Sequence, residues 1–229
     1  NHKLFFLDMI PILSYLFLGG QCRYCKQKMR PRYLLLEILS GSVFVLFAIS
    51  LKLSLLDSNA STMVYFVFGL FYIATLFIIA GIDKENLKIE KSVLLFGYII
   101  ETLYIIYLYI VEKDPNVYKY VIYLAIICIL NVIDIGILRK KVKNSYPIEI
   151  LLLCMLMLTF TYETVTILSI TFTLLVIAFQ LIGKRIFHKR TKTVKTEKKP
   201  ETKIPIGCYL CIANIICLLV TNTYIFWQI

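Results

Sequence analysis

The amino-acid sequence predicts an all-α polytopic membrane protein, a helical bundle with about seven transmembrane helices. Hydrophobic residues make up 59% of the chain and the mean hydropathy is +0.80, more apolar than a soluble globular domain. Several apolar runs approach the roughly 20 residues that a helix needs to cross a bilayer. These runs do not alternate between apolar and polar residues, as the strands of a transmembrane β-barrel would.

The net charge of +11 is explained by where the basic residues lie. Most of the lysines and arginines fall in loops between apolar runs, at residues 23–32, 84–91, 139–143 and 184–203. Basic loops of this kind mark the cytoplasmic side of a membrane and can contact anionic headgroups. We therefore expect membrane topology, and not nucleic-acid binding, to account for the charge.

Seven apolar spans follow one another, at residues 33–55, 62–82, 92–111, 117–138, 148–160, 165–182 and 204–227. If every basic loop is cytosolic, these spans alternate in direction. Residues 183–203 carry many basic and few apolar side chains, so we expect a mobile cytosolic loop there.

The segment before the first span differs from the rest of the chain. Residues 4–18 are apolar but short, and they contain Asp8 and Pro11, so we expect them in the cytosol or at the interface. We therefore divide the chain into an amino-terminal cytosolic or interfacial segment, residues 1–32, and a membrane-embedded domain, residues 33–229. The chain begins with Asn1 and not with Met, so we expect a longer natural protein.

Acidic residues within or beside apolar spans are candidates for chemistry, because a charge in the bilayer is unfavourable unless it has a function. Asp83 ends the second span, Asp134 lies near the end of the fourth, and Glu149 opens the fifth. The expected topology puts all three at the cytosolic side. Glu101, in the middle of the third span, is expected to be a polar contact that faces the bundle.

Two neighbouring carboxyl groups can hydrolyse a peptide bond without a covalent intermediate. One holds a proton while the other accepts a proton from water, because two like charges at close range do not both ionise. The alternative is that Asp83 and Glu149 only mark helix ends at the water boundary.

Cys22 and Cys25 form a C-x-x-C motif in the first basic loop. Two thiolates at this spacing are half of a four-cysteine zinc site, which an upstream pair would complete. The alternative is a reduced, solvent-facing pair without metal. Cys208 and Cys211 repeat the spacing within the last span, where cysteine usually acts as a small apolar residue.

Three segments near the amino terminus, D-M-I-P-I-L-S-Y-L, G-Q-C-R-Y-C and P-R-Y-L-L-L-E-I-L-S-G, together resemble the start of bacterial prepilin peptidases. The resemblance implies a multi-pass, aspartic-type endopeptidase of the bacterial inner membrane. Such an enzyme removes the basic leader of type IV pilin-like precursors at the cytosolic face. Proteolysis would need no cofactor, and S-adenosylmethionine would serve those members that also methylate the new amino terminus.

The resemblance extends unevenly to the acids. Asp83 is similar to the first catalytic aspartate of that family, which follows an apolar span. The second belongs to a G-x-G-D motif that this sequence lacks, and S-Y-P-I-E stands in its place. Either Glu149 corresponds to the aspartate, or Pro147 does and the acid is lost, with Asp134 as a third candidate. A glutamate would move the carboxyl group by roughly 1 Å, which can lower a rate about a hundredfold.

The sequence therefore favours an endopeptidase that uses Asp83 with Glu149 or Asp134. A catalytically silent relative that binds pilin-like precursors or assembly partners is the alternative. A small transporter is a third hypothesis, but its charges should lie near the membrane midplane, whereas all of these acids except Glu101 lie at the cytosolic ends.

Overall fold

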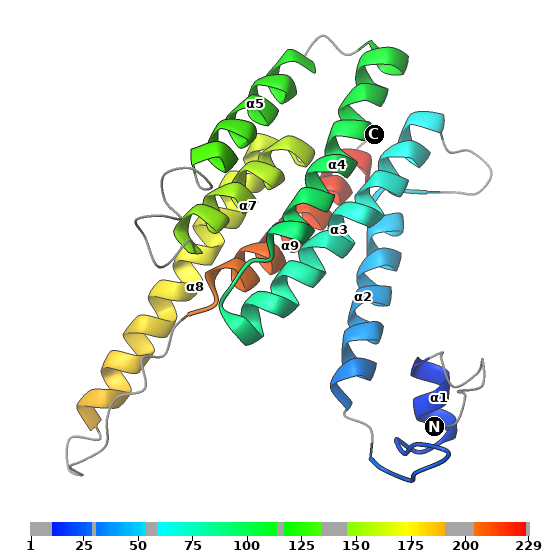
Figure 1. Ribbon diagram of the computed structural model, residues 1–229, viewed down its shortest axis with the longest axis vertical. Helices are drawn as coiled ribbons and strands as arrows, with labels where there is room; N and C mark the ends of the chain where they lie inside the picture. The colour runs from blue at the N-terminus through cyan, green and yellow to red at the C-terminus, as the bar shows by residue number, and fades with distance from the viewer. Residues whose placement is uncertain are drawn as a thin grey trace. The chain divides into compact units, whose positions relative to one another are not determined.

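The computed structural model describes residues 11–28, 31–53, 59–113, 117–133, 146–190 and 204–227. Within these ranges the side chains of residues 11–13, 32–33 and 184–190 are not described. The chain divides into two compact units, Asn1–Ile49 and Ser50–Ile229 (Figure 1). The domain division expected from the sequence, at residue 32, stays a prediction.

The described residues of the first unit form two helices and a turn-rich segment between them. Helix α1 (Pro11–Phe17) begins at a proline, whose fixed φ angle and missing N–H suit the first helical position. Gly19 and Gly20 follow it with φ values of 59° and 74°, a left-handed backbone that ends the helix. Helix α2 (Pro31–Ser50) also begins at a proline.

The second unit is a helical bundle, and its described residues contain no β-strand. Its helices are α3 (Ala60–Asn86), α4 (Lys91–Tyr107) with a π-helical turn η2 (Leu108–Glu112), α5 (Val117–Ile133), α7 (Tyr146–Phe160), α8 (Glu163–Arg190) and α9 (Ile206–Trp227). Helix α9 packs against α3 and α8, α4 packs against α3 and α7, and α5 packs against α7. Segments far apart in the sequence therefore meet along α9.

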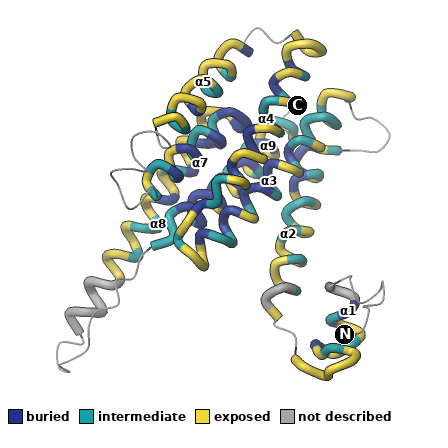
Figure 2. The backbone as a smooth tube through the Cα atoms, in the orientation of Figure 1, coloured by how far each residue is buried: buried dark blue, intermediate teal, exposed yellow. Residues whose placement is uncertain are grey.

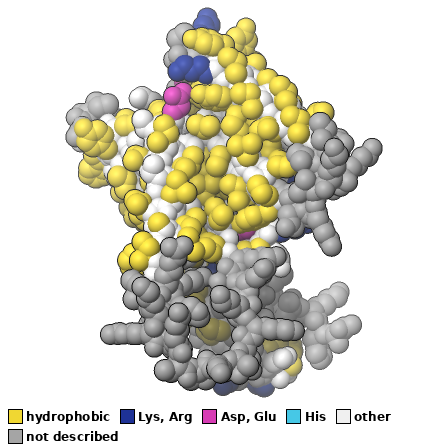
Figure 3. Space-filling view, turned by 90° about the vertical axis from the view of Figure 1, so that its left-hand side faces the viewer, with side chains coloured by type: hydrophobic (Ala, Val, Ile, Leu, Met, Phe, Trp, Pro, Cys, Tyr) yellow, Lys and Arg dark blue, Asp and Glu magenta, His cyan; other side chains and the backbone are white. Residues whose placement is uncertain are grey.

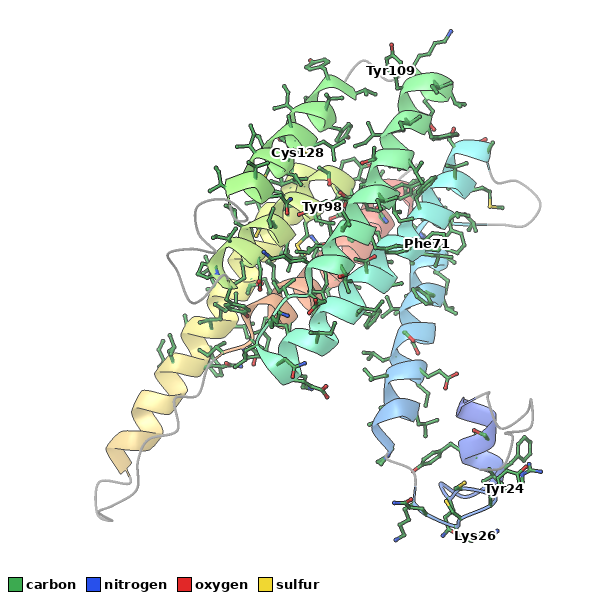
Figure 4. The ribbon with its side chains drawn as sticks, viewed as in Figure 1. Tyr24, Lys26, Phe71, Tyr98, Tyr109 and Cys128 are labelled. Atoms are coloured by element: carbon green, nitrogen blue, oxygen red, sulfur yellow. The ribbon has the colours of Figure 1, made fainter. Side chains whose placement is uncertain are left out.

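The core of this unit lies where α3, α4, α7 and α9 face one another (Figure 2). Phe160 stacks on Tyr72, with ring centroids 4.3 Å apart, and on Tyr65, at 5.6 Å. Hydrogen bonds between buried groups also join the helices. The Tyr72 hydroxyl donates to Asn214 Oδ1 at 2.8 Å, and the Tyr98 hydroxyl donates to the Leu152 carbonyl at 2.9 Å (Figure 4). Such contacts fix how the helices lie against one another in a lipid environment.

Within the described residues, four helices are long and apolar enough to cross a membrane: Ala60–Asn86, Lys91–Glu112, Glu163–Gly183 and Ile206–Trp227. Shorter apolar helices are Leu34–Ser50, Val117–Ile133 and Tyr146–Phe160. Large hydrophobic side chains cover much of the face that Figure 3 shows, as expected for helices that contact lipid. The prediction of an all-α polytopic membrane bundle is confirmed.

Two predictions about helix ends are wrong. The sequence predicts a loop over residues 83–91, but α3 continues through Asp83 to Asn86. Leu87 then adopts a left-handed conformation and its N–H donates to the Asp83 carbonyl at 2.9 Å, which ends the helix. The sequence also predicts a loop from residue 183, but α8 continues to Arg190, because lysine and arginine are good helix formers. Residues 191–203 lie outside the described residues.

Gly97 of α4 generates a testable prediction about packing. A Cβ atom at this position would lie 2.6 Å from Leu156 Cδ1 and 3.2 Å from Thr75 Cγ2, whereas a Cβ at Gly81 of α3 meets nothing within 4 Å. Both glycines are helical, so alanine improves the helix propensity at both positions. We expect Gly97→Ala to be less stable than Gly81→Ala by about 1–3 kcal/mol, measured by thermal unfolding in detergent. Equal stability of the two variants would contradict this packing.

Candidate active site

Asp83 lies in the last turn of α3, and its side chain contacts the first turn of α9. The residue is fully buried, at 0% exposure, and the Cys208 N–H donates to Asp83 Oδ2 at 2.8 Å. The first N–H groups of a helix have no partner within the helix and carry partial positive charge. A carboxyl group from α3 therefore caps the start of α9.

Tyr146, at the start of α7, completes this cap. Its hydroxyl oxygen accepts hydrogen bonds from the N–H groups of Ile206, at 3.0 Å, and Gly207, at 3.3 Å. The same hydroxyl lies beside the Asp83 carboxyl group. Two side chains from different helices thus satisfy the three leading N–H groups of α9.

Gly207 lets the α9 backbone approach the acid closely. A Cβ atom there would lie 3.1 Å from Asp83 Oδ2 and 3.2 Å from Ile89 Cδ1, which is tighter than ordinary van der Waals contact. Pro205, one residue before α9, cannot continue a preceding helix and favours the turn that starts α9. The local sequence I-P-I-G therefore fits a helix start that presses against a carboxyl group.

Glu149 lies in the first turn of α7 and is 2% exposed. Its Oε2 accepts a hydrogen bond from the Ile89 N–H at 3.2 Å, and the Ile89 side chain, also fully buried, lies against Gly207, the glycine that approaches Asp83. Asp83 and Glu149 are also close enough to interact electrostatically. The structure therefore brings these two predicted site residues together around Ile89.

One oxygen of this site has no partner. Asp83 Oδ1 is buried, and within the described part of the chain it accepts no hydrogen bond. Buried polar atoms almost always have a partner, so an unsatisfied carboxyl oxygen indicates a group that binds something else, such as water or substrate. Asp83 thus has one oxygen bonded to the start of α9 and one without a hydrogen bond in the described part of the chain.

Glu101 lies apart from this pair. Glu101 of α4 is 1% exposed, and the Thr159 hydroxyl donates to its Oε2, so its geometry is that of a polar contact facing the bundle. Helix α4 starts two residues after Ile89, and Glu101 lies about 15 Å further along this helix, so it is away from the Asp83–Glu149 pair. Asp134, the third candidate from the sequence, lies outside the described residues.

Cys22 and Cys25 lie in the turn between α1 and α2. The Cys22 N–H donates to the Gln27 carbonyl at 2.9 Å, the Lys26 N–H donates to the Cys22 carbonyl at 3.0 Å, and Lys26 has a φ of 56° (Figure 4). Both cysteines of the motif therefore lie in one tight turn. Within the described residues, no group of three or more candidate ligands is present.

The sequence gives little indication that Tyr146 and Ile89 are parts of the site. Tyr146 acts through a hydroxyl that faces residues 60 positions away, and Ile89 acts through its backbone N–H. Neither role can be recognised from the type of residue or from its spacing in the sequence. The tyrosine three residues before the acid, in S-Y-P-I-E, is the sequence feature that could have pointed to Tyr146.

The fold and the site define a class: a polytopic helical membrane protein with two carboxyl groups buried together at one end of its bundle. Comparison with known proteins narrows this class. Residues 1–51 match the family described as Bacterial Peptidase A24 N-terminal domain. The amino-terminal part of the chain is therefore similar to the type IV prepilin peptidases, which confirms the resemblance recognised in the sequence.

Curated relatives with the same similarity are prepilin leader peptidases by name. A Klebsiella pneumoniae protein named Prepilin leader peptidase/N-methyltransferase is 36% identical over 81 residues, which cover 34% of this chain and 31% of that protein. A protein of the same name from Aeromonas salmonicida (strain A449) is 41% identical over 51 residues, which cover 22% of this chain and 18% of that protein. The chain thus covers less than a third of the length of these relatives. No solved structure matches the chain.

The cap at the start of α9 generates a second prediction. Tyr146→Phe removes the acceptor of the Gly207 N–H and one of the two acceptors of the Ile206 N–H, which also donates to the Ile204 carbonyl at 3.0 Å. We therefore expect a loss of about 1 kcal/mol in the free energy of unfolding. Tyr224→Phe, on the exposed side of α9, is the matched control and should change stability by less than about 0.5 kcal/mol. Thermal unfolding of the purified protein measures both. Equal effects of the two variants would mean that the hydroxyl does not cap α9.

Proposed function

We propose that this chain is a membrane aspartic-type endopeptidase that cleaves the basic leader of type IV pilin-like precursors. The observation that carries the proposal is the joint burial of Asp83 and Glu149 around Ile89 at one end of the bundle. The similarity of residues 1–51 to prepilin leader peptidases supports the substrate class.

The proposed reaction is direct attack of water on the peptide carbonyl. Asp83 acts as the base, because its Oδ1 is unpartnered in the described part of the chain and its Oδ2 is held by the start of α9. Oδ1 accepts a proton from water as the water oxygen bonds to the carbonyl carbon. Glu149 is the proposed general acid, which gives a proton to the departing nitrogen as the carbon–nitrogen bond breaks. The proton on Asp83 then returns to Glu149 through solvent.

The substrate would approach from the cytosolic side. Lys84 and Lys88 lie on the same end of the bundle as the acids, as the positive-inside rule expects for a cytosolic end. The proposal places cleavage at a Gly–Phe-like bond after a short basic leader, which is the bond that the family resemblance implies. The localisation would be the bacterial inner membrane.

The proposal includes two cofactors, zinc and S-adenosylmethionine, and neither takes part in proteolysis. Zinc would bind Cys22 and Cys25 with two further ligands and would organise the turn between α1 and α2. S-adenosylmethionine would be needed only for methylation of the new amino terminus, and the name of the relatives includes that activity. Proteolysis by Asp83 and Glu149 needs neither.

The second candidate function is a catalytically silent protein that binds pilin-like precursors or assembly partners. The observation that favours it is that each acid already has a structural partner: Asp83 caps α9, and Glu149 accepts the Ile89 N–H. Acids that serve only as caps would leave binding intact and cleavage absent.

Cleavage of a tagged precursor by membranes that contain the protein separates these functions. We expect Asp83→Asn and Glu149→Gln each to lower the cleavage rate about a hundredfold or more, because each removes a proton-transfer group. Glu112→Gln, an exposed acid at the other end of α4, is the control and should cleave like the parent.

Asp134→Asn tests the remaining candidate for the second acid. If Asp134→Asn cleaves normally and Glu149→Gln does not, the pair is Asp83 with Glu149. Cleavage that survives both Asp83→Asn and Glu149→Gln would refute the proposed site. Retained precursor binding without cleavage by the parent would establish the silent function.

A further inference from the structure

A cavity of about 490 Å³ lies at the end of the bundle where α7 ends and α8 begins. Residues from α5, from the α7–α8 turn and from α9 line it, among them Lys119, Tyr120, Tyr123, Tyr162, Glu163 and Thr221. The volume is within the roughly 300–1,000 Å³ that ligand sites occupy. Its lining is rich in tyrosine and threonine hydroxyl groups, which bind polar ligands.

This cavity is distant from the carboxyl pair. Helix α9 begins beside Asp83, and the α9 residues that line the cavity, Thr221 and Ile225, lie in its last two turns. From Cys208 to Ile225 the helix rises about 25 Å, close to the thickness of the hydrocarbon core. The cavity and the candidate active site are therefore near opposite surfaces of the membrane.

Two opposite charges meet at this cavity. Lys119 Nζ lies 4.0 Å from Glu163 Oε1, and the Tyr123 hydroxyl donates to the same oxygen at 3.1 Å. The side chains of Lys119 and Glu163 are 48% and 58% exposed, so both charged groups are accessible to a ligand. An exposed ion pair contributes only about 0–1 kcal/mol to stability, so the fold does not require this one.

The surroundings of this pair are those of a lipid-facing surface. Val121 and Ile122 of α5 and Ile167 and Leu168 of α8 are each about half exposed. Figure 3 shows a largely hydrophobic face on which basic and acidic side chains lie close together near the upper end. Tyrosines are enriched where membrane helices meet the lipid headgroups. A charged pair beside tyrosines at the ends of such helices therefore lies at headgroup depth.

We propose that this cavity binds the headgroup of a zwitterionic phospholipid with a primary amine, such as phosphatidylethanolamine. Lys119 would bind the lipid phosphate, and Glu163 with the Tyr123 hydroxyl would bind the lipid ammonium group. Neighbouring tyrosine rings add cation–π attraction for the same ammonium. The proposal does not depend on the peptidase function.

The charges also distinguish this lipid from others. An anionic headgroup such as glycerol phosphate offers Glu163 no cation, and its negative charge would be repelled by the carboxylate. A trimethylammonium group has no N–H to donate, so phosphatidylcholine loses the hydrogen bonds to Glu163 and Tyr123. The site therefore selects for both the charge pattern and the hydrogen-bond donors of an ethanolamine headgroup.

Native mass spectrometry of the full chain, released from nanodiscs that contain equal parts of phosphatidylethanolamine, phosphatidylglycerol and phosphatidylcholine, tests the proposal. We expect phosphatidylethanolamine to be retained preferentially. Lys119→Gln and Glu163→Gln should each weaken its retention about tenfold, as the loss of one charge-assisted hydrogen bond predicts. Glu112→Gln and Lys113→Gln, on exposed positions between α4 and α5, are the matched controls and should retain it like the parent.

Three outcomes would overturn the proposal. The first is equal retention of the three lipids by the parent. The second is unchanged retention in both cavity variants, when circular dichroism shows that they are folded. The third is binding of soluble phosphoethanolamine as tight as that of the lipid, which would identify a site for a free metabolite instead of a membrane lipid.

Discussion

The start of α9 is the constraint on which the rest of the candidate site depends. The first N–H groups of a helix have no partner within that helix, so buried ones need acceptors from elsewhere in the chain. Asp83 from α3 and Tyr146 from α7 supply them, and Gly207 gives them room to approach. Three helices that are distant in sequence therefore meet at one point, and the burial of Asp83 is a consequence of this meeting.

The same arrangement is compatible with the proposed role of Asp83 in catalysis as well as with its structural role. The bond from the Cys208 N–H occupies one oxygen of Asp83 and fixes the orientation of the carboxyl group, while Oδ1 is left without a partner in the described structure. A fixed acid with an open oxygen is preorganised for proton transfer. Glu149 is held in a similar way through Ile89, so the separation of the two acids is set by backbone groups and not by their own flexible side chains.

The sequence predicts the helical bundle and the importance of Asp83 and Glu149, because apolar runs of this length form membrane helices and a carboxyl group beside them is unfavourable unless it has a function. It does not predict that Asp83 lies inside α3, since the end of that helix depends on the left-handed Leu87. It also does not predict Tyr146 and Ile89, whose roles follow from contacts between helices. The correspondence between Glu149 and a family aspartate stays a prediction, because the G-x-G-D motif that would fix the alignment is absent.

Amide hydrogen exchange of Ile206, Gly207 and Cys208 in the full chain in lipid nanodiscs tests the central claim most directly. The first N–H groups of an uncapped helix exchange quickly, because they lack partners. If Asp83 and Tyr146 hold these groups, all three will exchange as slowly as amides in the middle of α9. Exchange as fast as at the exposed start of α8, at Glu163 and Thr164, would contradict the account.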